Sequence, residues 1–128
     1  FNLPCGLPAL IKSLWVKEKL KSVGFFWNHK EEVIKKIHEE LSEVKEEFNK
    51  KNNSKKIKDE IGDLIFSVIN LARFINIDPE EALENTNKKF IKRFQHMEDE
   101  VKENKKSLKM MSLKEMNMYW EKAKKYYG

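Results

Sequence analysis

Apolar residues recur every three or four positions along most of this chain, with polar residues between them. That spacing puts apolar side chains on one face of an α-helix. It predicts helices over five segments, namely 8–22, 29–50, 54–76, 79–104 and 112 to near the C-terminus. Only four glycines and three prolines occur among 128 residues rich in Lys, Glu, Leu, Ile and Met, so the chain is predicted to be all-α.

Residues that favour helix caps mark several boundaries of these segments. Asn28 is expected to cap the second helix, and Asp78, which is followed by a proline, to cap the fourth. Ser112 and Glu115 have the spacing of an S-x-x-E capping box at the start of the last helix. The charged segment 102–109 is expected to be a loop.

Two of the predicted helices carry apolar stripes that define a candidate core. The stripe of the second helix consists of Val33, Ile37, Leu41, Val44 and Phe48. The stripe of the third helix consists of Ile57, Ile61, Leu64, Ile65, Val68 and Leu71. Segment 64–75 is apolar on nearly every side, which is typical of a buried helix. It is therefore interpreted either as the central element of the fold or as half of an oligomer interface.

The length and the cysteine content limit the class of protein. The 128 residues are expected to form one domain, 1–128, and the abrupt start at Phe1 is consistent with a segment of a longer chain. The single cysteine, Cys5, excludes an internal disulfide and is interpreted as incidental. No apolar run reaches membrane-spanning length and no secretory signal is visible, so no membrane partner is expected and a cytoplasmic location is predicted.

The charge balance indicates an anionic partner without identifying it. The chain carries 26 Lys and Arg against 21 Asp and Glu, a net charge of +5. A basic excess of this kind favours either nucleic acid or a phosphorylated small molecule.

Two pairs of carboxylates are the main candidates for chemistry. Glu40 and Glu43, like Glu60 and Asp63, are three residues apart, so each pair lies on one side of its helix. Both Glu40 and Glu60 fall between apolar positions, at the edge of the predicted core. If the two helices pack antiparallel, four carboxylates converge and repel one another, and a cation such as Mg²⁺ relieves that repulsion. The alternative is an ordinary solvated face of a helix rich in Lys and Glu.

Other polar and aromatic positions allow two interpretations. Gly24 is expected to end the first helix, and the aromatic cluster 25–27 after it is interpreted as a hydrophobic plug and not as a ligand contact. Asn70 lies two helical turns beyond Asp63. A buried Asn needs hydrogen-bond partners, so Asn70 is either a structural hydrogen-bonder or a substrate contact.

Basic residues in the last two helices have the spacing of anion-binding groups. Lys89 and Arg93 share a helix face and can clamp an anion, although a solvated basic face has the same pattern. Trp120 and Lys124 are also four residues apart. They can hold a nucleobase and a phosphate, or Trp120 can simply dock the last helix onto the core.

Motifs along nearly the whole chain make it resemble MazG-type nucleoside triphosphate pyrophosphohydrolases, most of all the C-terminal catalytic domain of the two-domain bacterial proteins. The E-E-x-x-E and E-x-x-D signature is present as Glu39-Glu40-Leu41-Ser42-Glu43 and Glu60-Ile61-Gly62-Asp63. Further matching blocks occur in the family's order, at 7–10, 23–27, 68–73, 78–83, 87–94, 112–116 and 120–124. One departure is Phe26, where the family often has an acid, so the substrate preference of this chain is expected to differ.

The resemblance implies a helical bundle whose helices pair with a second subunit, as a homodimer or a higher homo-oligomer. It implies Mg²⁺-dependent hydrolysis of nucleoside triphosphates to monophosphate and pyrophosphate, with Mn²⁺ as a substitute metal, in housekeeping of the nucleotide pool. Residues matching the metal ligands are Glu40, Glu43, Glu60 and Asp63, with Glu39 as an additional acid. Residues matching substrate contacts are Lys36, Lys56, Lys89 and Arg93 for the polyphosphate, and Trp120 and Lys124 near the nucleotide.

A rival hypothesis is a lysine-rich helical module that binds nucleic acid or dimerises without catalysis. The complete set of four acids counts against it, because neither binding nor dimerisation requires those acids. Nucleic acid is therefore not expected as a partner, and a nucleoside triphosphate substrate is.

Overall fold

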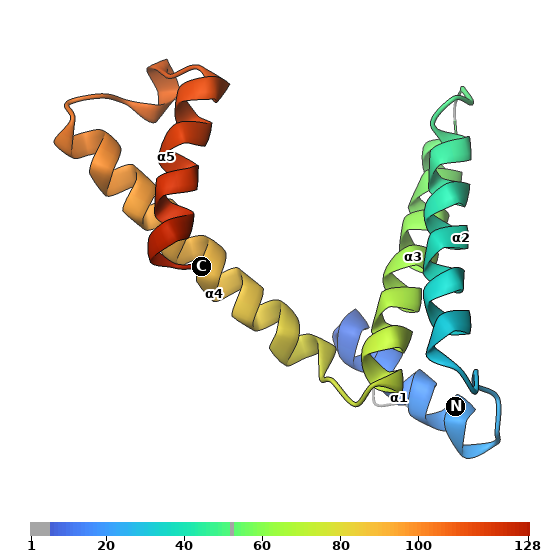
Figure 1. Ribbon diagram of the computed structural model, residues 1–128. Coiled ribbons are helices and arrows are strands. Elements are labelled where there is room, and N and C mark those ends of the chain that lie inside the picture. The colour runs from blue at the N-terminus through green and yellow to red at the C-terminus, as the bar shows by residue number, and fades with distance from the viewer. Residues whose placement is uncertain (1–5, 52) are drawn as a thin grey trace. The chain divides into compact units, whose positions relative to one another are not determined.

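A computed structural model describes residues 6–51 and 53–128, and every regular element among them is helical (Figure 1). The predicted all-α class is confirmed. The structure divides into two compact units, Phe1–Glu80 and Glu81–Gly128. Cys5, interpreted from the sequence as incidental, lies outside the described residues. None of the described helices is long and apolar enough to cross a membrane.

The first unit is built on a helical hairpin. Its helices are α1 (Ala9–Ser22), α2 (Lys30–Glu47) and α3 (Ser54–Phe74). Helices α2 and α3 run side by side in opposite directions, and α1 packs on α3 (Figure 1). The antiparallel arrangement on which the convergence of the carboxylates depended is therefore present.

The turn between α2 and α3 is closed by a buried carboxylate. The side chain of Asn53 donates hydrogen bonds to the Glu47 backbone carbonyl and to Glu47 Oε2, the latter at 3.0 Å. Lys50 Nζ lies 3.1 Å from Glu47 Oε1. Because these bonds engage the end of the helix, α2 stops at Glu47, three residues before the predicted end.

Three helices end in the left-handed backbone conformation that closes a Schellman motif. Gly24 ends α1 as predicted, with φ +82°, and the next amide donates to Leu20 O at 2.9 Å. Asn76, with φ +60°, ends α3, and Lys105, with φ +56°, ends α4. Because the chain reverses at these residues, α3 and α4 end slightly before the predicted positions.

At the start of α2 the predicted cap is wrong. The N-cap is His29 and not Asn28, since the His29 carbonyl accepts the first helical bond, from Glu32 N at 3.2 Å. The His29 side chain makes no capping hydrogen bond. The start of α2 is therefore not stabilised by a hydrogen bond from the side chain of its N-cap residue.

The second unit contains α4 (Pro79–Glu103), which begins just before it, the short 3₁₀ helix η1 (Leu108–Met110) and α5 (Leu113–Tyr126). Helix α5 folds back along the C-terminal half of α4 (Figure 1). Their core is formed by Met97, Val101 and Tyr119, with Leu108, Met111, Met116 and Trp120 packed around it. The expected loop over 102–109 is only partly correct, because the end of α4 and the start of η1 fall within it.

The predicted caps of the last two helices are confirmed. Asp78 Oδ1 accepts a hydrogen bond from Glu80 N at 2.9 Å, and Ser112 Oγ accepts one from Glu115 N at 3.2 Å. The Glu115 carboxylate lies 3.5 Å from Lys106 Nζ. Local sequence therefore decides where these helices start.

The apolar stripe of the hairpin is only partly buried. Val33 and Val44 are buried, but Leu41 and Phe48, expected in the core, are 45% and 64% exposed. On α3 the exposed apolar residues are Ile61, Ile65 and Val68. The third helix is therefore not the buried central element of the single chain, and the interpretation as half of an oligomer interface remains.

Candidate functional site

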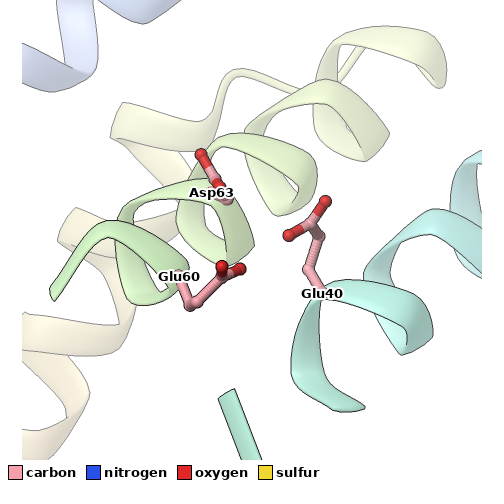
Figure 2. Close-up of side chains that lie close together, drawn as sticks. All are labelled: Glu40, Glu60 and Asp63. Atoms are coloured by element: carbon pink, nitrogen blue, oxygen red, sulfur yellow. The ribbon is translucent and has the colours of Figure 1, made fainter. Parts of the chain in front are cut away.

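Three carboxylates meet where α2 faces α3. One oxygen from each of Glu40, Glu60 and Asp63 lies within 4.8 Å of the other two (Figure 2). Glu40 comes from α2, and the other two come from successive turns of α3. The spacing in the sequence and the antiparallel packing together therefore create a cluster of oxygen ligands of the kind that divalent cations bind.

Two of these carboxylates are buried, and each has an oxygen without a partner. Glu40 is 5% exposed and Glu60 is 7% exposed. Among the described residues, Glu40 Oε2 and Glu60 Oε2 have no hydrogen-bond donor. A buried carboxylate oxygen without a donor is energetically costly, and a bound cation removes that cost. The donor set therefore fits a hard metal ion such as Mg²⁺.

Two lysines hold the other oxygens of the buried carboxylates. Lys36 Nζ lies 2.8 Å from Glu40 Oε1, and Lys56 Nζ lies 3.4 Å from Glu60 Oε1. Lys36 is also 3.9 Å from Oε2 of the exposed Glu39. The hydrogen bond to Glu40 raises the pKa of Lys36 above its usual value. These lysines fix the carboxylates while leaving one oxygen of each directed elsewhere.

Crowding of negative charge raises the pKa values of the neighbouring acids. Hydrogen bonding with Glu60, followed by repulsion from Glu40, raises the pKa of Glu43 to about 7. Desolvation, followed by repulsion from Glu40 and Glu60, raises the pKa of Asp63. Glu43 is exposed and is not part of the group of three, but it lies close enough to be influenced by it. The cluster thus carries more negative charge than its lysines compensate.

A cavity of about 460 Å³ opens beside the carboxylates within the first unit. Its lining includes Glu40, Asp63 and Lys36 together with an aromatic wall. The wall consists of Phe25, Phe26, Trp27, Phe66 and Phe74. The expected hydrophobic plug is therefore wrong for Phe25 and Phe26, which are 73% and 48% exposed and border this cavity.

Three further polar side chains, of Lys17, Asn70 and Arg73, belong to the lining of the cavity. Asn70 is half-buried and lines the cavity, and both of its predicted roles, structural hydrogen-bonder and substrate contact, remain predictions. Lys17 and Arg73 also line it. Arg73 ends the matching block 68–73 but was not predicted as a site residue, and no motif indicated Lys17. Arg73 forms an ion pair with Glu18, whereas the Lys17 ammonium lies 3.7 Å from the centroid of the Phe66 ring.

The remaining candidate residues, Lys89, Arg93, Trp120 and Lys124, lie in the second unit. Arg93 Nε donates to Tyr127 O at 2.8 Å, and its guanidinium lies 5.9 Å from the Trp120 ring. The Trp120 ring is 4.6 Å from that of Phe90, which favours a docking role for it. Lys89 is exposed, and Lys124 Nζ lies 3.7 Å from Glu121. Of the two residues expected to clamp an anion, Arg93 thus already donates a hydrogen bond to the C-terminal backbone.

Comparison with known proteins finds similarity along most of the chain. Residues 28–98 match the MazG nucleotide pyrophosphohydrolase domain. The chain is 40% identical over 118 residues to the nucleoside triphosphate pyrophosphohydrolase/pyrophosphatase MazG of Thermotoga maritima, covering 92% of this chain and 45% of that protein. It is 32% identical over 125 residues to the nucleoside triphosphate pyrophosphohydrolase of Escherichia coli K12, covering 97% of this chain and 48% of that protein. The chain thus spans about half the length of these two relatives.

Proposed function

Because the chain belongs to the MazG nucleotide pyrophosphohydrolase domain family, we propose that it hydrolyses nucleoside triphosphates to the monophosphate and pyrophosphate. The cluster of Glu40, Glu60 and Asp63 is the observation that carries this proposal, because cleavage of a triphosphate requires a site that neutralises its charge. Both relatives align over more residues than either unit contains, which supports one functional domain over 1–128.

The proposed cofactor is Mg²⁺, with Mn²⁺ as a substitute. Glu40, Glu60 and Asp63 would hold it, with Glu43 beside them, because hard cations prefer carboxylate oxygens and two of these oxygens lack any other partner. When bound, the ion supplies charge neutralisation on the phosphates and lowers the pKa of a coordinated water.

The chain's own residues orient the ligands and contact the substrate. Lys36 and Lys56 hold one oxygen of Glu40 and of Glu60, so that the other oxygen is available to the metal. Both lysines also have the charge to bind phosphate oxygens, and exposed Glu39 is an additional acid beside Lys36.

Further substrate contacts are proposed on both units. Asn70 in the cavity is a proposed contact of the nucleoside part. In the second unit, Lys89 and Arg93 are proposed to bind the polyphosphate, and Trp120 and Lys124 to lie near the nucleotide. Their positive charges and the family resemblance support these assignments.

The proposed assembly is a homodimer or a higher homo-oligomer. Helices α2 and α3, together with Phe48 directly after α2, expose apolar side chains that a second copy of the chain would cover. On the helices these are Leu41, Ile61, Ile65 and Val68. Burial of such a face is a main driving force of subunit association. The proposed substrates belong to the cytoplasmic nucleotide pool, so we place the protein in the cytoplasm.

The test measures pyrophosphate release from a panel of NTPs and dNTPs, with and without Mg²⁺. The Glu60→Gln variant keeps the size of the side chain and removes the charged ligand. We expect it to lower kcat about 100-fold or more, since even groups supporting metal ligands are worth about 10- to 100-fold. Glu46→Gln, an exposed acid on α2, is the matched control and should retain activity. Full activity of Glu60→Gln would contradict the proposed metal site.

A further inference from the structure

Lys17 is a half-buried cation in the cavity whose role the proposed reaction leaves open. Its ammonium group lies 3.7 Å from the centroid of the Phe66 ring, and its side chain lines the same cavity as Glu40 and Asp63. Among the described residues, no carboxylate oxygen lies within 4.0 Å of Lys17 Nζ. Its N–H donors are therefore available to a molecule that enters the cavity.

Other cations of the cavity are already engaged or exposed. Lys36 is bound to Glu40, and a terminal nitrogen of Arg73 is paired with Glu18, although the buried Arg73 Nε has no partner among the described residues. Lys21 is exposed to solvent. Partial burial lowers the pKa of Lys17 to about 8, so burial of this charge has a cost that a bound acceptor would offset. A ligand with a hydrogen-bond acceptor would therefore pair with the Lys17 ammonium group, which already lies against an aromatic ring.

The lining and the volume of the cavity indicate which part of a nucleotide it receives. Glu40 and Asp63 lie where the proposed metal and polyphosphate would be, and five other residues of the lining are aromatic. A volume of about 460 Å³ lies within the usual range of pockets for small molecules. A nucleobase, with apolar faces and a polar edge, matches a lining in which aromatic side chains lie beside the unpaired ammonium group of Lys17.

We propose that Lys17 selects the nucleobase by donating a hydrogen bond to a ring carbonyl oxygen, so that guanine, uracil and thymine nucleotides are preferred to adenine nucleotides. This inference rests on the proposed pyrophosphohydrolase function. An ammonium group donates and never accepts. Guanine O6 and the O4 of uracil or thymine are acceptors, whereas adenine presents an amino donor at the corresponding position. A lysine at that edge therefore favours the keto bases.

The experiment compares kcat and KM for GTP, UTP and ATP, measured as pyrophosphate release. We expect kcat/KM of the unmodified chain to be about tenfold or more higher for GTP and UTP than for ATP, the worth of one hydrogen bond to a charged group. Lys17→Met should remove this advantage, mainly through KM, and leave ATP within about twofold. The matched control is Lys12→Met, an exposed lysine of α1 outside the cavity lining, which should keep the preference.

Several results would overturn the inference. One is that the unmodified chain shows no preference for GTP and UTP over ATP. Another is that Lys17→Met loses activity equally on GTP, UTP and ATP, because loss of a phosphate contact or of a structural role affects all three equally. If Lys17→Met fails to fold, Lys17→Gln provides the test, since its amide both donates and accepts. The ratio of GTP to ATP turnover should then fall toward one, and an unchanged ratio overturns the inference. Pyrophosphate release from none of the nucleotides would instead overturn the proposed function itself.

Discussion

Lys36 Nζ lies 2.8 Å from Glu40 Oε1, while the second oxygen of the same carboxylate is buried without a hydrogen-bond partner among the described residues. One oxygen is thus held by a cation of the chain itself, and the other is left for an external one. This division of a single carboxylate explains how a buried acid is tolerated in the free protein and still available to a metal.

The first prediction concerns this ion pair. Lys36→Met should lower the free energy of unfolding by about 1–2 kcal/mol, because it leaves a buried carboxylate without its hydrogen-bonded cation. Chemical denaturation in EDTA measures the change. Lys35→Met, an exposed neighbour on α2, is the control and should change stability little. Equal stability of the two variants would show that the pair contributes nothing.

A second prediction is that Mg²⁺ stabilises the folded protein. A ligand at 100 times its Kd adds about 2.7 kcal/mol to the free energy of unfolding. Differential scanning calorimetry with increasing MgCl₂ should therefore show a rising Tm for the unmodified chain and for Glu46→Gln, but little rise for Glu60→Gln. A rise of the same size in Glu60→Gln would place the metal elsewhere.

The turn between α2 and α3 gives a prediction for pH. Hydrogen bonds from Asn53, followed by Lys50, lower the pKa of Glu47 below its usual value. A lowered folded-state pKa stabilises the fold above the unfolded-state pKa, about 4.3 for Glu. That contribution is lost as the pH falls through the folded-state pKa.

Glu47→Gln should therefore reduce Tm near neutral pH, and this difference should shrink as the pH falls through the lowered folded-state pKa of Glu47. Thermal melts between pH 3 and pH 7 measure the effect. Glu31→Gln, at an exposed position of the first turn of α2, provides a comparison from the same helix. A Glu47→Gln deficit that stays constant over this pH range would contradict the assigned role of the charge.

The end of α4 offers a stabilising substitution. Lys105 has φ +56°, a conformation in which L-residues are strained and glycine is not. Lys105→Gly should raise the free energy of unfolding by about 0.5–1 kcal/mol, since the relief of strain exceeds the added entropy of the unfolded chain. Urea denaturation measures it. Lys102→Gly, within the last turn of the same helix, should have the opposite effect.

The proposed subunit interface can be tested with one charge. Ile65 is 54% exposed on α3, and Ile65→Glu places a carboxylate on the apolar face. We expect the apparent mass in light scattering to fall to that of a monomer, because burial of an unpaired charge opposes association. Val23→Glu, at a 70% exposed position outside α2 and α3, should leave the mass unchanged. A monomeric unmodified chain would refute the interface.

The clustering of Glu40, Glu60 and Asp63 could be predicted from the sequence because helical spacing and apolar neighbours fix the face on which each lies. Lys17 could not be found in the same way. Its importance depends on how α1 packs on α3, a tertiary relationship that no local spacing contains. Whether its ammonium group has a carboxylate partner also depends on the tertiary structure, which decides the acids that lie near it.

The errors in the predicted core have a similar origin. An apolar stripe reveals which face of a helix avoids water, but it does not reveal what covers that face. Leu41 and Phe48 belong to the same predicted stripe as Val33 and Val44, yet they remain largely exposed in the single chain. Helix ends were misjudged where Lys105 adopts a conformation usually reserved for glycine, because residue type gives little warning of it.

The three clustered carboxylates all belong to the hairpin of α2 and α3, which is continuous in sequence. Their convergence depends on contacts between near neighbours in the chain, which form rapidly during folding. This acidic cluster can therefore assemble before α4 and α5 have folded. The order of the elements along the chain therefore favours an order of folding, in which the acidic cluster forms before the basic residues of α4 and α5 reach their positions.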